Sequence, residues 1–117
     1  ADNPFVDPGE LDLLVNTFKS NNFDYVCNHQ NRMNNKYADG FGAEILSYRT
    51  LRKLNREVSS PKHREHVTQF MWKKIKNFKI FCIPASNDLA FPKLRFDIDT
   101  KKDLLNLKKL VKKIRLI

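Results

Sequence analysis

Apolar side chains recur at helical spacing early in the chain, directly after residues that favour a helix start. Asp7 can cap a helix, Pro8 suits the first helical position, and Glu10 would complete a capping box. The apolar positions that follow repeat with the period of a helix. They are Leu11, Leu14, Val15 and Phe18. This pattern predicts an amphipathic helix that begins at Pro8.

Short apolar runs bounded by polar residues predict strands. One run covers residues 23–27, a second covers residues 42–48, and a third covers residues 78–84. Residues 94–98 alternate strictly between apolar and polar side chains, which is typical of a strand with one exposed face. The polar, Asn-rich residues 29–40 predict a long loop, and long loops in compact domains are often binding loops.

Three further helices are predicted between and after these strands. Residues 49–57 and residues 61–76 each carry apolar side chains at helical spacing. The last helix begins after Thr100, which would form a capping box with Asp103. Its predicted buried face consists of Leu104, Leu107, Leu110, Val111 and Ile114. Because strands and helices alternate, the pattern predicts an α/β fold, with residues 1–117 as a single domain.

The net charge of +9 is unevenly distributed, and this widens the range of partners to consider. Residues 49–79 carry ten Lys and Arg against two Glu, a balance of +8, and residues 100–117 carry seven against one Asp, a balance of +6. A basic surface attracts nucleic acid, anionic lipid or phosphorylated small molecules. One hypothesis is therefore a non-catalytic basic binding module for nucleic acid or an acidic protein partner. The sequence carries no recognisable nucleic-acid-binding motif, and a solvated Lys-rich surface is the simpler interpretation.

Cys27 and Cys82 are the two cysteines of the chain, and both lie in predicted strands. The sequence has no CxxC pair and no Cys/His cluster, so a zinc site is not expected. Two reduced, buried thiols are typical of a cytoplasmic protein. No apolar run approaches the roughly 20 residues that span a bilayer, and the first residues lack a signal-peptide pattern. We therefore expect a cytoplasmic protein without membrane contact.

Two aspartates occupy positions where open α/β sheets bind ligands. Asp99 follows the predicted strand 94–98 and precedes a helix, and Asp2 stands before the helix that begins at Pro8. Ligands of such sheets lie at the carboxyl ends of the strands. Paired carboxylates suit a hard cation such as Mg²⁺. From spacing alone, the alternative is that these aspartates cap helices or face solvent.

A second candidate cluster is Arg64, Glu65 and His66, in the first turns of the predicted helix 61–76. Arg64 could bind a phosphate or carboxylate through two hydrogen bonds. Glu65 and His66 could orient that group or transfer protons. The alternative is an exposed helix start, in which Glu65 is favoured by the helix dipole and His66 lies on the surface.

Five segments of the chain resemble, in order, the C-terminal half of SpsF-type (spore coat polysaccharide) cytidylyltransferases. The segments read DNPFVDPGELDLLVNTF, FDYVCN, DGFGAEILSYRTL, REHVTQF and LRFDIDTKKDLLNLKKL. This family is similar to the acylneuraminate and 3-deoxy-manno-octulosonate cytidylyltransferases. The resemblance covers nearly all of the chain. It implies a nucleotide-diphospho-sugar transferase-like α/β/α sandwich with a mixed sheet.

The resemblance also implies a reaction and its components. An oxygen of an acidic sugar would attack the α-phosphate of CTP, giving a CMP-sugar and pyrophosphate for surface polysaccharide biosynthesis. The implied cofactor is Mg²⁺, held by residues that match family positions, namely Asp2 and Asp99. The implied substrate-binding residues are Asn3, Asp39, Gly40 and Glu44. The implied active-site lining and catalytic residues are Arg64, Glu65 and His66.

The chain departs from the family pattern in three ways. Ala1 precedes Asp2 where the family usually has Gly. The late motif reads D-T-K-K-D-L where the family has D-T-P-E-D-L, which changes the helix start but keeps Asp99. The basic, nucleotide-binding loop of the family's N-terminal half, with its first strands, has no counterpart in the sequence. We therefore expect an incomplete fragment that is inactive alone. CTP and an acidic sugar are the expected partners, together with a second copy of the chain or the missing N-terminal half, and nucleic acid is not expected.

Overall fold

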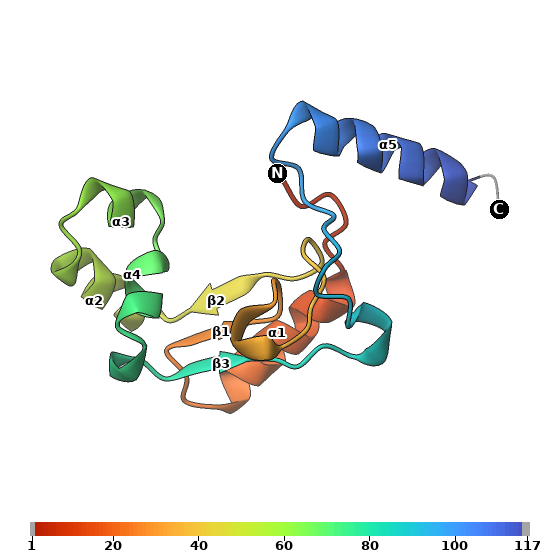
Figure 1. Cartoon of the computed structure of the whole chain (residues 1–117). Helices are drawn as coiled ribbons and strands as arrows, with labels where there is room; N and C mark the ends of the chain where they lie inside the picture. The colour runs from red at the N-terminus through yellow and green to blue at the C-terminus, as the bar shows by residue number, and fades with distance from the viewer. Residues whose placement is uncertain (1, 116–117) are drawn as a thin grey trace.

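A three-stranded sheet flanked by helices forms the centre of the fold (Figure 1). The computed structural model describes residues 2–115. The helices are α1 (Pro8–Ser20), α2 (Tyr48–Glu57), α3 (Pro61–Glu65), α4 (Gln69–Lys73) and α5 (Lys101–Arg115). The strands are β1 (Tyr25–Cys27), β2 (Glu44–Leu46) and β3 (Ile80–Cys82). Short 3₁₀ turns are η1 (Arg32–Asn34), η2 (Ile75–Asn77) and η3 (Asn87–Leu89).

Strand β1 is the central strand of a mixed sheet with the order β2-β1-β3. It runs antiparallel to β2 and parallel to β3. Its three residues are all buried, which explains why this segment reads as an uninterrupted apolar run. Cys27 lies opposite Glu44 on one side and opposite Cys82 on the other. The predicted α/β class with a mixed sheet is confirmed, although each strand is shorter than the run that predicted it.

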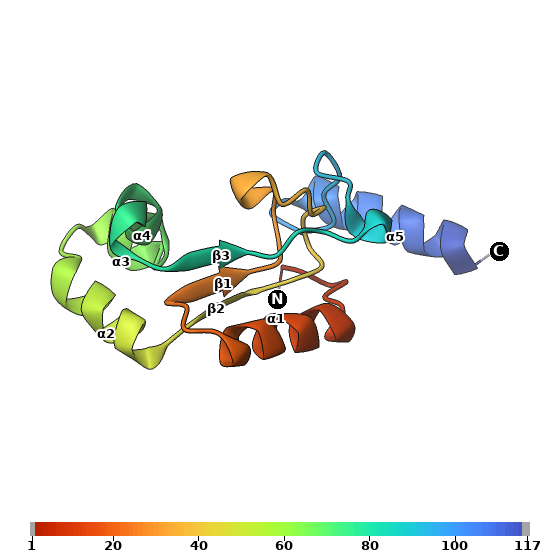
Figure 2. The same ribbon diagram turned by 90° about the horizontal axis from the view of Figure 1, so that it is seen from below.

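Helix α1 covers one face of the sheet, and helices α2, α3 and α4 lie together beyond one end of the strands (Figure 2). Helix α1 lies along one face, where a buried cluster forms from Leu14, Val26, Tyr37 and Ile83. Helices α2 and α4 contribute to the opposite cluster, which comprises Tyr25, Cys27, Leu54, Met71 and Phe78. Alternate residues of β1 thus enter different cores, as the two-residue period of a strand requires.

Helix α1 begins as predicted, but its capping box is only half formed. The Asp7 carboxylate accepts hydrogen bonds from the backbone N–H groups of Gly9 at 2.7 Å and Glu10 at 3.3 Å. The Glu10 carboxylate does not accept a hydrogen bond from the Asp7 N–H, as a complete capping box would require. It accepts from the buried Tyr37 hydroxyl at 2.6 Å, and the Asp7 N–H donates to the carbonyl of Phe41 at 3.0 Å. A tertiary partner therefore replaces the predicted local one.

The single helix predicted over residues 61–76 is wrong, because the segment breaks into α3, α4 and η2. His66 leaves the helical region, with φ −104° and ψ 82°. It is followed by Val67 and Thr68, whose β-branched side chains lower helix propensity. The turn also brings Met71 into the core, where it is fully buried.

The strand predicted over residues 94–98 is also wrong, since this segment makes only one bridge to the rest of the sheet region. The Asp39 N–H donates to the Leu94 carbonyl at 3.0 Å, and the Phe96 N–H donates to the Asp39 carbonyl at 2.9 Å. The ladder stops there because Gly40 turns the neighbouring chain away with a φ of +106°. A Cβ at Gly40 would lie only 2.9 Å from the backbone of Phe96.

Helix α5 confirms the predicted capping box but not the predicted buried face. The Asp103 N–H donates to the Thr100 hydroxyl at 3.2 Å, and the Thr100 N–H donates to the Asp103 carboxylate at 2.8 Å. Among the five residues predicted to be buried, only Leu107 is buried, whereas Ile114 is 58% exposed. Figure 1 shows the reason, because α5 projects away from the sheet and its covering helices.

Candidate functional site

A cavity of about 590 Å³ opens at the edge of the sheet where β1 ends and β2 begins. Since β3 runs parallel to β1, this is the carboxyl edge of both strands, where open α/β sheets bind ligands. The cavity is lined by Asp2, His29, Gln30, Arg32, Glu44, His66, Val67, Thr68, Gln69 and Trp72. We refer to it below as the central cavity. The central cavity is lined by residues from four parts of the chain, namely the N-terminal segment, the 29–40 loop, β2 and the α3–α4 segment.

Glu44 is the most connected carboxylate of the central cavity. Its Oε1 accepts a 2.6 Å hydrogen bond from the Tyr25 hydroxyl and a 3.5 Å bond from the Thr68 hydroxyl. The Nε2 atom of His29 lies 3.4 Å from the same oxygen. Burial by itself would raise the pKa of Glu44. The hydrogen bonds from His29 and Tyr25 have the larger combined effect, so the pKa of Glu44 is lowered. Glu44 is therefore ionised at neutral pH.

Two buried polar atoms of the cavity-lining residues have no hydrogen-bond partner among the described residues. They are Gln69 Oε1 and Trp72 Nε1. Buried polar groups are normally satisfied, so these two atoms beside one cavity are available to a polar ligand or water. The guanidinium of Arg32 lies over the Trp72 ring at 4.8 Å and supplies a positive charge beside them.

Two smaller hollows adjoin the central cavity. One of about 410 Å³ shares Asp2, His29 and Glu44 with it and adds Asn3. The other, of about 400 Å³, shares Gln30 and Arg32 and is also lined by Asp39 and Arg95. The three hollows thus form a continuous polar region around the 29–40 loop, large enough for a sugar and part of a nucleotide.

Asp99 lies outside these hollows, in a cluster of carboxylates around one arginine. The Nη2 atom of Arg95 donates to Asp97 at 2.5 Å and to Asp99 at 2.8 Å, and its Nε atom lies 4.0 Å from Asp39. The bond from Arg95 lowers the pKa of Asp97. Burial and the charge of Asp97 raise the pKa of Asp39. Arg95 therefore compensates the mutual repulsion of three nearby carboxylates.

The two aspartates assigned to Mg²⁺ lie on neighbouring segments. The Ile98 N–H donates to the Asp2 carbonyl at 2.7 Å, which holds the N-terminal segment beside Asp99. Arg95 contacts only the Oδ2 atom of Asp99, and the side chain is 61% exposed, so its Oδ1 atom can serve as a ligand. Within residues 2–115, no group of three or more His, Cys, Asp or Glu is placed to hold a metal. Mg²⁺ commonly takes only one or two protein carboxylates and completes its shell with water and phosphate, so two aspartates on neighbouring segments are compatible with such a site.

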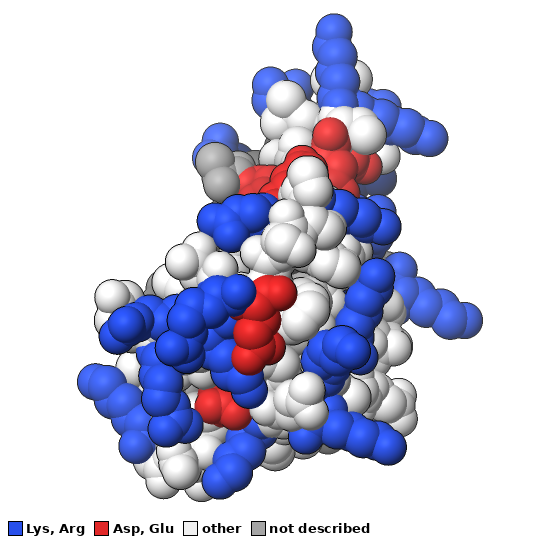
Figure 3. All heavy atoms as spheres, turned by 90° about the vertical axis from the view of Figure 1, so that its left-hand side faces the viewer, with Lys and Arg blue, Asp and Glu red and all other residues white. Residues whose placement is uncertain are grey.

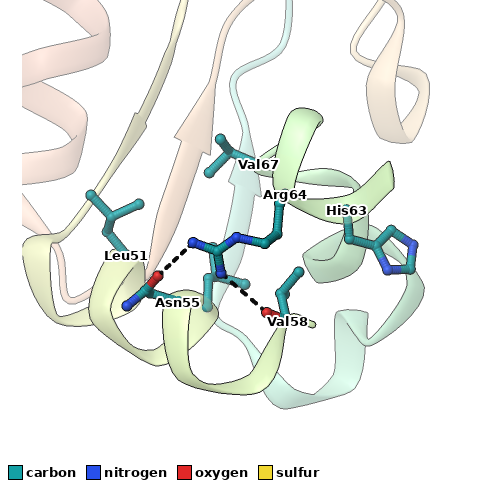
Figure 4. A pocket seen from close by; sticks show the side chains of 7 residues that line it. Leu51, Asn55, Val58, His63, Arg64 and Val67 are labelled. Carbon is teal, nitrogen blue, oxygen red and sulfur yellow. Dashed lines mark hydrogen bonds between the residues drawn. The ribbon is translucent and has the colours of Figure 1, made fainter. Parts of the chain in front are cut away.

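The three residues of the REH cluster do not point into one site. Figure 4 shows Arg64 directed at helix α2, where its guanidinium donates to the Val58 carbonyl at 3.3 Å and to the Asn55 side chain at 3.1 Å. Arg64 lines a separate, mainly apolar pocket of about 130 Å³. Glu65 is exposed at the end of α3, and His66 lines the central cavity.

The structure therefore brings together part of the predicted site. Its cavity and the adjoining hollows include Asp2, Asn3, Asp39, Glu44 and His66. Gly40 lies behind them as a buried turn residue. The sequence reasoning missed seven residues that line the central cavity, among them His29, Arg32, Gln69 and Trp72. His29 carried a usable signal, because it is the second residue after a buried strand.

Lys and Arg gather on the face formed by α2, α3 and α4 (Figure 3). This face contains much of the basic segment 49–79. Its arginines include Arg64, which is already bonded to α2. No helix within residues 2–115 is both long and apolar enough to cross a membrane.

Comparisons with known proteins identify relatives along almost the whole chain. No protein-family model matches. The spore coat polysaccharide biosynthesis protein SpsF of Bacillus subtilis is 27% identical over 97% of the chain and 45% of its own length. An uncharacterized protein of Methanocaldococcus jannaschii is 29% identical over 88% of the chain and 40% of its own length.

A solved structure resembles the chain in three dimensions as well. It is a cytidylyltransferase from Leptospira borgpetersenii serovar Hardjo-bovis, 32% identical, with a TM-score of 0.79. The match covers 92% of the chain and 44% of the solved structure. The chain thus spans less than half the length of each of these relatives.

Proposed function

We propose that the chain, which is similar to SpsF and to a solved cytidylyltransferase, forms the sugar- and metal-binding part of a nucleotidyltransferase of the SpsF type. The reaction would transfer CMP from CTP to an oxygen of an acidic sugar. That oxygen attacks the α-phosphorus, the bond to the leaving phosphate breaks, and pyrophosphate departs. The observation that carries the proposal is the structural likeness to a cytidylyltransferase over 92% of the chain.

The central cavity supplies suitable groups for the acceptor sugar. Glu44 is ionised and its Oε1 lies 3.4 Å from His29, so the pair can orient a sugar hydroxyl and accept its proton. Arg32 provides a positive charge for the carboxylate of an acidic sugar. Trp72 and Gln69 border the same cavity and offer a donor and an acceptor for further hydroxyls.

Asp2 and Asp99 are the residues that would hold Mg²⁺. When bound, this ion supplies positive charge to the phosphate oxygens as negative charge builds on them. Arg95 positions Asp99 through its 2.8 Å hydrogen bond. Phosphoryl transfer depends mainly on positioning and charge stabilisation, so these residues have no covalent role to perform.

We further propose that the activity resides in the cytoplasm and serves the synthesis of a surface polysaccharide, as the printed name of the Bacillus subtilis relative suggests for that protein. The chain by itself is expected to show little or no turnover, because none of its segments matches the family's basic phosphate-binding loop. Homodimer formation, or pairing with the remaining half of the fold, would complete the site.

Calorimetric titration of the purified chain with CTP, with and without Mg²⁺, tests the metal and nucleotide part of this proposal. We expect Mg²⁺-dependent binding that Asp99→Asn weakens at least tenfold. Asp88→Asn, the same change at an exposed aspartate of η3, should leave binding unaltered. If both variants bind equally well, the assignment of Asp99 is wrong. If the folded chain does not bind CTP with Mg²⁺, the titration is repeated with the remaining half of the fold added in trans, and a lack of binding there overturns the cytidylyltransferase proposal.

The basic face formed by α2, α3 and α4 supports one alternative, a non-catalytic module that binds nucleic acid or an acidic protein (Figure 3). Such binding would weaken steeply with salt, because each neutralised phosphate releases counterions. Fluorescence anisotropy with a labelled single-stranded RNA across a salt series distinguishes the two functions. We expect only weak, non-specific binding near physiological salt, and tight binding there would favour the alternative.

A further inference from the structure

The two cysteines of the chain are in direct contact across the sheet. Cys27 ends β1, Cys82 ends β3, and the parallel register places them opposite each other. Their Sγ atoms lie 3.3 Å apart, although 55 positions separate them in the sequence. Both are free thiols. Neighbouring strands are about 4.8 Å apart, which falls inside the Cα separation of about 4.4–6.8 Å that disulfides span.

The surroundings of this pair differ from those of two inert core cysteines. Cys27 is fully buried, whereas Cys82 is partly exposed, so small molecules have access from one side. His29 and Arg32 lie close enough to act electrostatically on the two sulfurs. The hydrogen bond from Cys82 lowers the pKa of Cys27 to about 7, while the same contact raises the pKa of Cys82. At neutral pH the pair can therefore carry one thiolate, and the partly exposed Cys82 is the side from which an oxidant reaches it.

We propose that Cys27 and Cys82 are an oxidation-sensitive thiol pair that closes to an intramolecular disulfide when the protein meets a peroxide. This inference goes beyond the proposed function and does not depend on it. The side chains of the pair share one row of the sheet with Glu44, which lies opposite Cys27 on β2. A bond there would tie the ends of β1 and β3 together directly beneath the central cavity.

The oxidation balances with hydrogen peroxide as the oxidant. One sulfur, as thiolate, attacks an oxygen of the peroxide; the O–O bond breaks, and the sulfenic acid forms with release of water. The second sulfur then attacks the sulfenic sulfur, the S–O bond breaks, and a second water leaves. In total, two thiols and one peroxide give one disulfide and two waters.

Peptide mapping of the intact chain after brief peroxide treatment tests the pair. Excess thiol is blocked before trypsin cleavage, which releases residues 20–32 with Cys27 and residues 80–93 with Cys82. We expect these two peptides to be recovered as one disulfide-linked species that dithiothreitol separates. The protein should run as a monomer without reductant, and both thiols should disappear together. Peptide mass is the appropriate readout because Met33, 61% exposed, takes up oxygen independently.

The proposal is overturned if the two peptides remain separately blocked at a peroxide dose that oxidises free glutathione completely. It is equally overturned if the linked species is intermolecular, or if each cysteine gains oxygen without forming the bridge. Cys82→Ala provides the matched control. In this variant the Cys27 thiol should be lost at least tenfold more slowly than in the wild type, since the partly exposed sulfur and the hydrogen bond to Cys27 are both removed.

Discussion

At the scale of single residues, the central cavity depends on hydrogen bonds that hold Glu44 in its charged form. The Tyr25 side chain is fully buried, and its hydroxyl donates to Glu44 at 2.6 Å. Burial, followed by this bond, raises the pKa of Tyr25, while the pKa of Glu44 is lowered. The core on one face of the sheet and the candidate site are therefore joined through one side-chain contact.

Tyr25→Phe should lower the free energy of unfolding by about 2 kcal/mol at neutral pH, the usual value of a hydrogen bond to a charged group. The folded pKa of Glu44 lies below its unfolded value of about 4.3, so its stabilisation is complete above that pH and is lost as pH falls through the folded pKa. The difference between variant and wild type should therefore shrink in acid. Urea unfolding at several pH values measures it.

Tyr48→Phe is the control for that comparison, because Tyr48 is 75% exposed and the substitution removes the same hydroxyl while keeping the aromatic ring. It should change the free energy of unfolding by less than about 0.5 kcal/mol at any pH. An equal effect of both substitutions, or a Tyr25→Phe effect that grows in acid, would contradict the role given to Glu44.

A second residue-scale feature is the close approach of Gly42 to Asn28. The Ala43 N–H donates to the buried Asn28 side chain at 2.9 Å, and the Asn28 amide group donates to the Glu10 carbonyl. A Cβ at Gly42 would overlap the carbonyl and side-chain oxygens of Asn28. This contact fixes the start of β2, and hence Glu44, relative to β1.

Gly42→Ala should cost more than about 3 kcal/mol of stability, because backbone atoms must move to admit the methyl group. Gly9→Ala makes the same change in the first turn of α1, where the nearest atom is a side-chain oxygen of Asp7 at 3.1 Å. It should alter stability by no more than about 1 kcal/mol. Thermal unfolding of both variants compares them, and similar midpoints would show that the close approach is unimportant.

At the scale of elements, helices that lie on the sheet differ from the helix that does not. Helix α1 packs against the sheet through Leu14, and its N-terminal cap is formed by Asp7. Helix α5 has a complete capping box but little tertiary contact. Stability of α1 is thus tied to the whole fold, whereas α5 relies on local interactions.

Asp7→Ala should lower the free energy of unfolding by about 1 kcal/mol, because two backbone N–H groups at the start of α1 lose their acceptor. Asp12→Ala removes an exposed carboxylate from the middle of the same helix and serves as control. Asp12→Ala should leave the free energy of unfolding unchanged or raise it slightly, since Ala favours a helix more than Asp does. Chemical unfolding followed by circular dichroism measures both, and a null result for Asp7→Ala would argue against the cap.

At the scale of the whole molecule, the chain is more extended than a compact domain of its size. The radius of gyration of the described residues is 15.9 Å, against about 13.4 Å expected for 117 residues in one compact body. The projecting helix α5 accounts for the long axis (Figure 1). Large apolar side chains are exposed along it, including Leu104, Leu105 and Ile114.

Native-state hydrogen exchange should separate α5 from the sheet. The amides of α5 should exchange through local opening that low urea concentrations hardly change, because the opening exposes little new surface. Those of β1 should exchange only through global unfolding. If the amides of α5 and β1 show the same free energy of opening and the same urea dependence, α5 unfolds together with the sheet and the prediction is wrong.

Local sequence rules predicted the features that depend on neighbours in the chain. The cap at Asp7, the capping box of Thr100 and Asp103 and the buried run of β1 are of this kind. The predictions from sequence were wrong where a residue far away in the chain changed a local hydrogen bond or ended a strand pairing. Glu10 bonds to Tyr37 instead of to its own helix start, and Gly40 ends the pairing that residues 94–98 could otherwise have continued.

The sequence by itself determined the α/β class and the resemblance to SpsF-type cytidylyltransferases, because these follow from residue type and spacing. Only the tertiary structure decided which side chains meet. It placed His29 and Trp72 beside Glu44, turned Arg64 away toward α2, and brought Cys27 into contact with Cys82. Such pairings depend on strand register and on the path of loops, and no short-range pattern in the chain encodes either one.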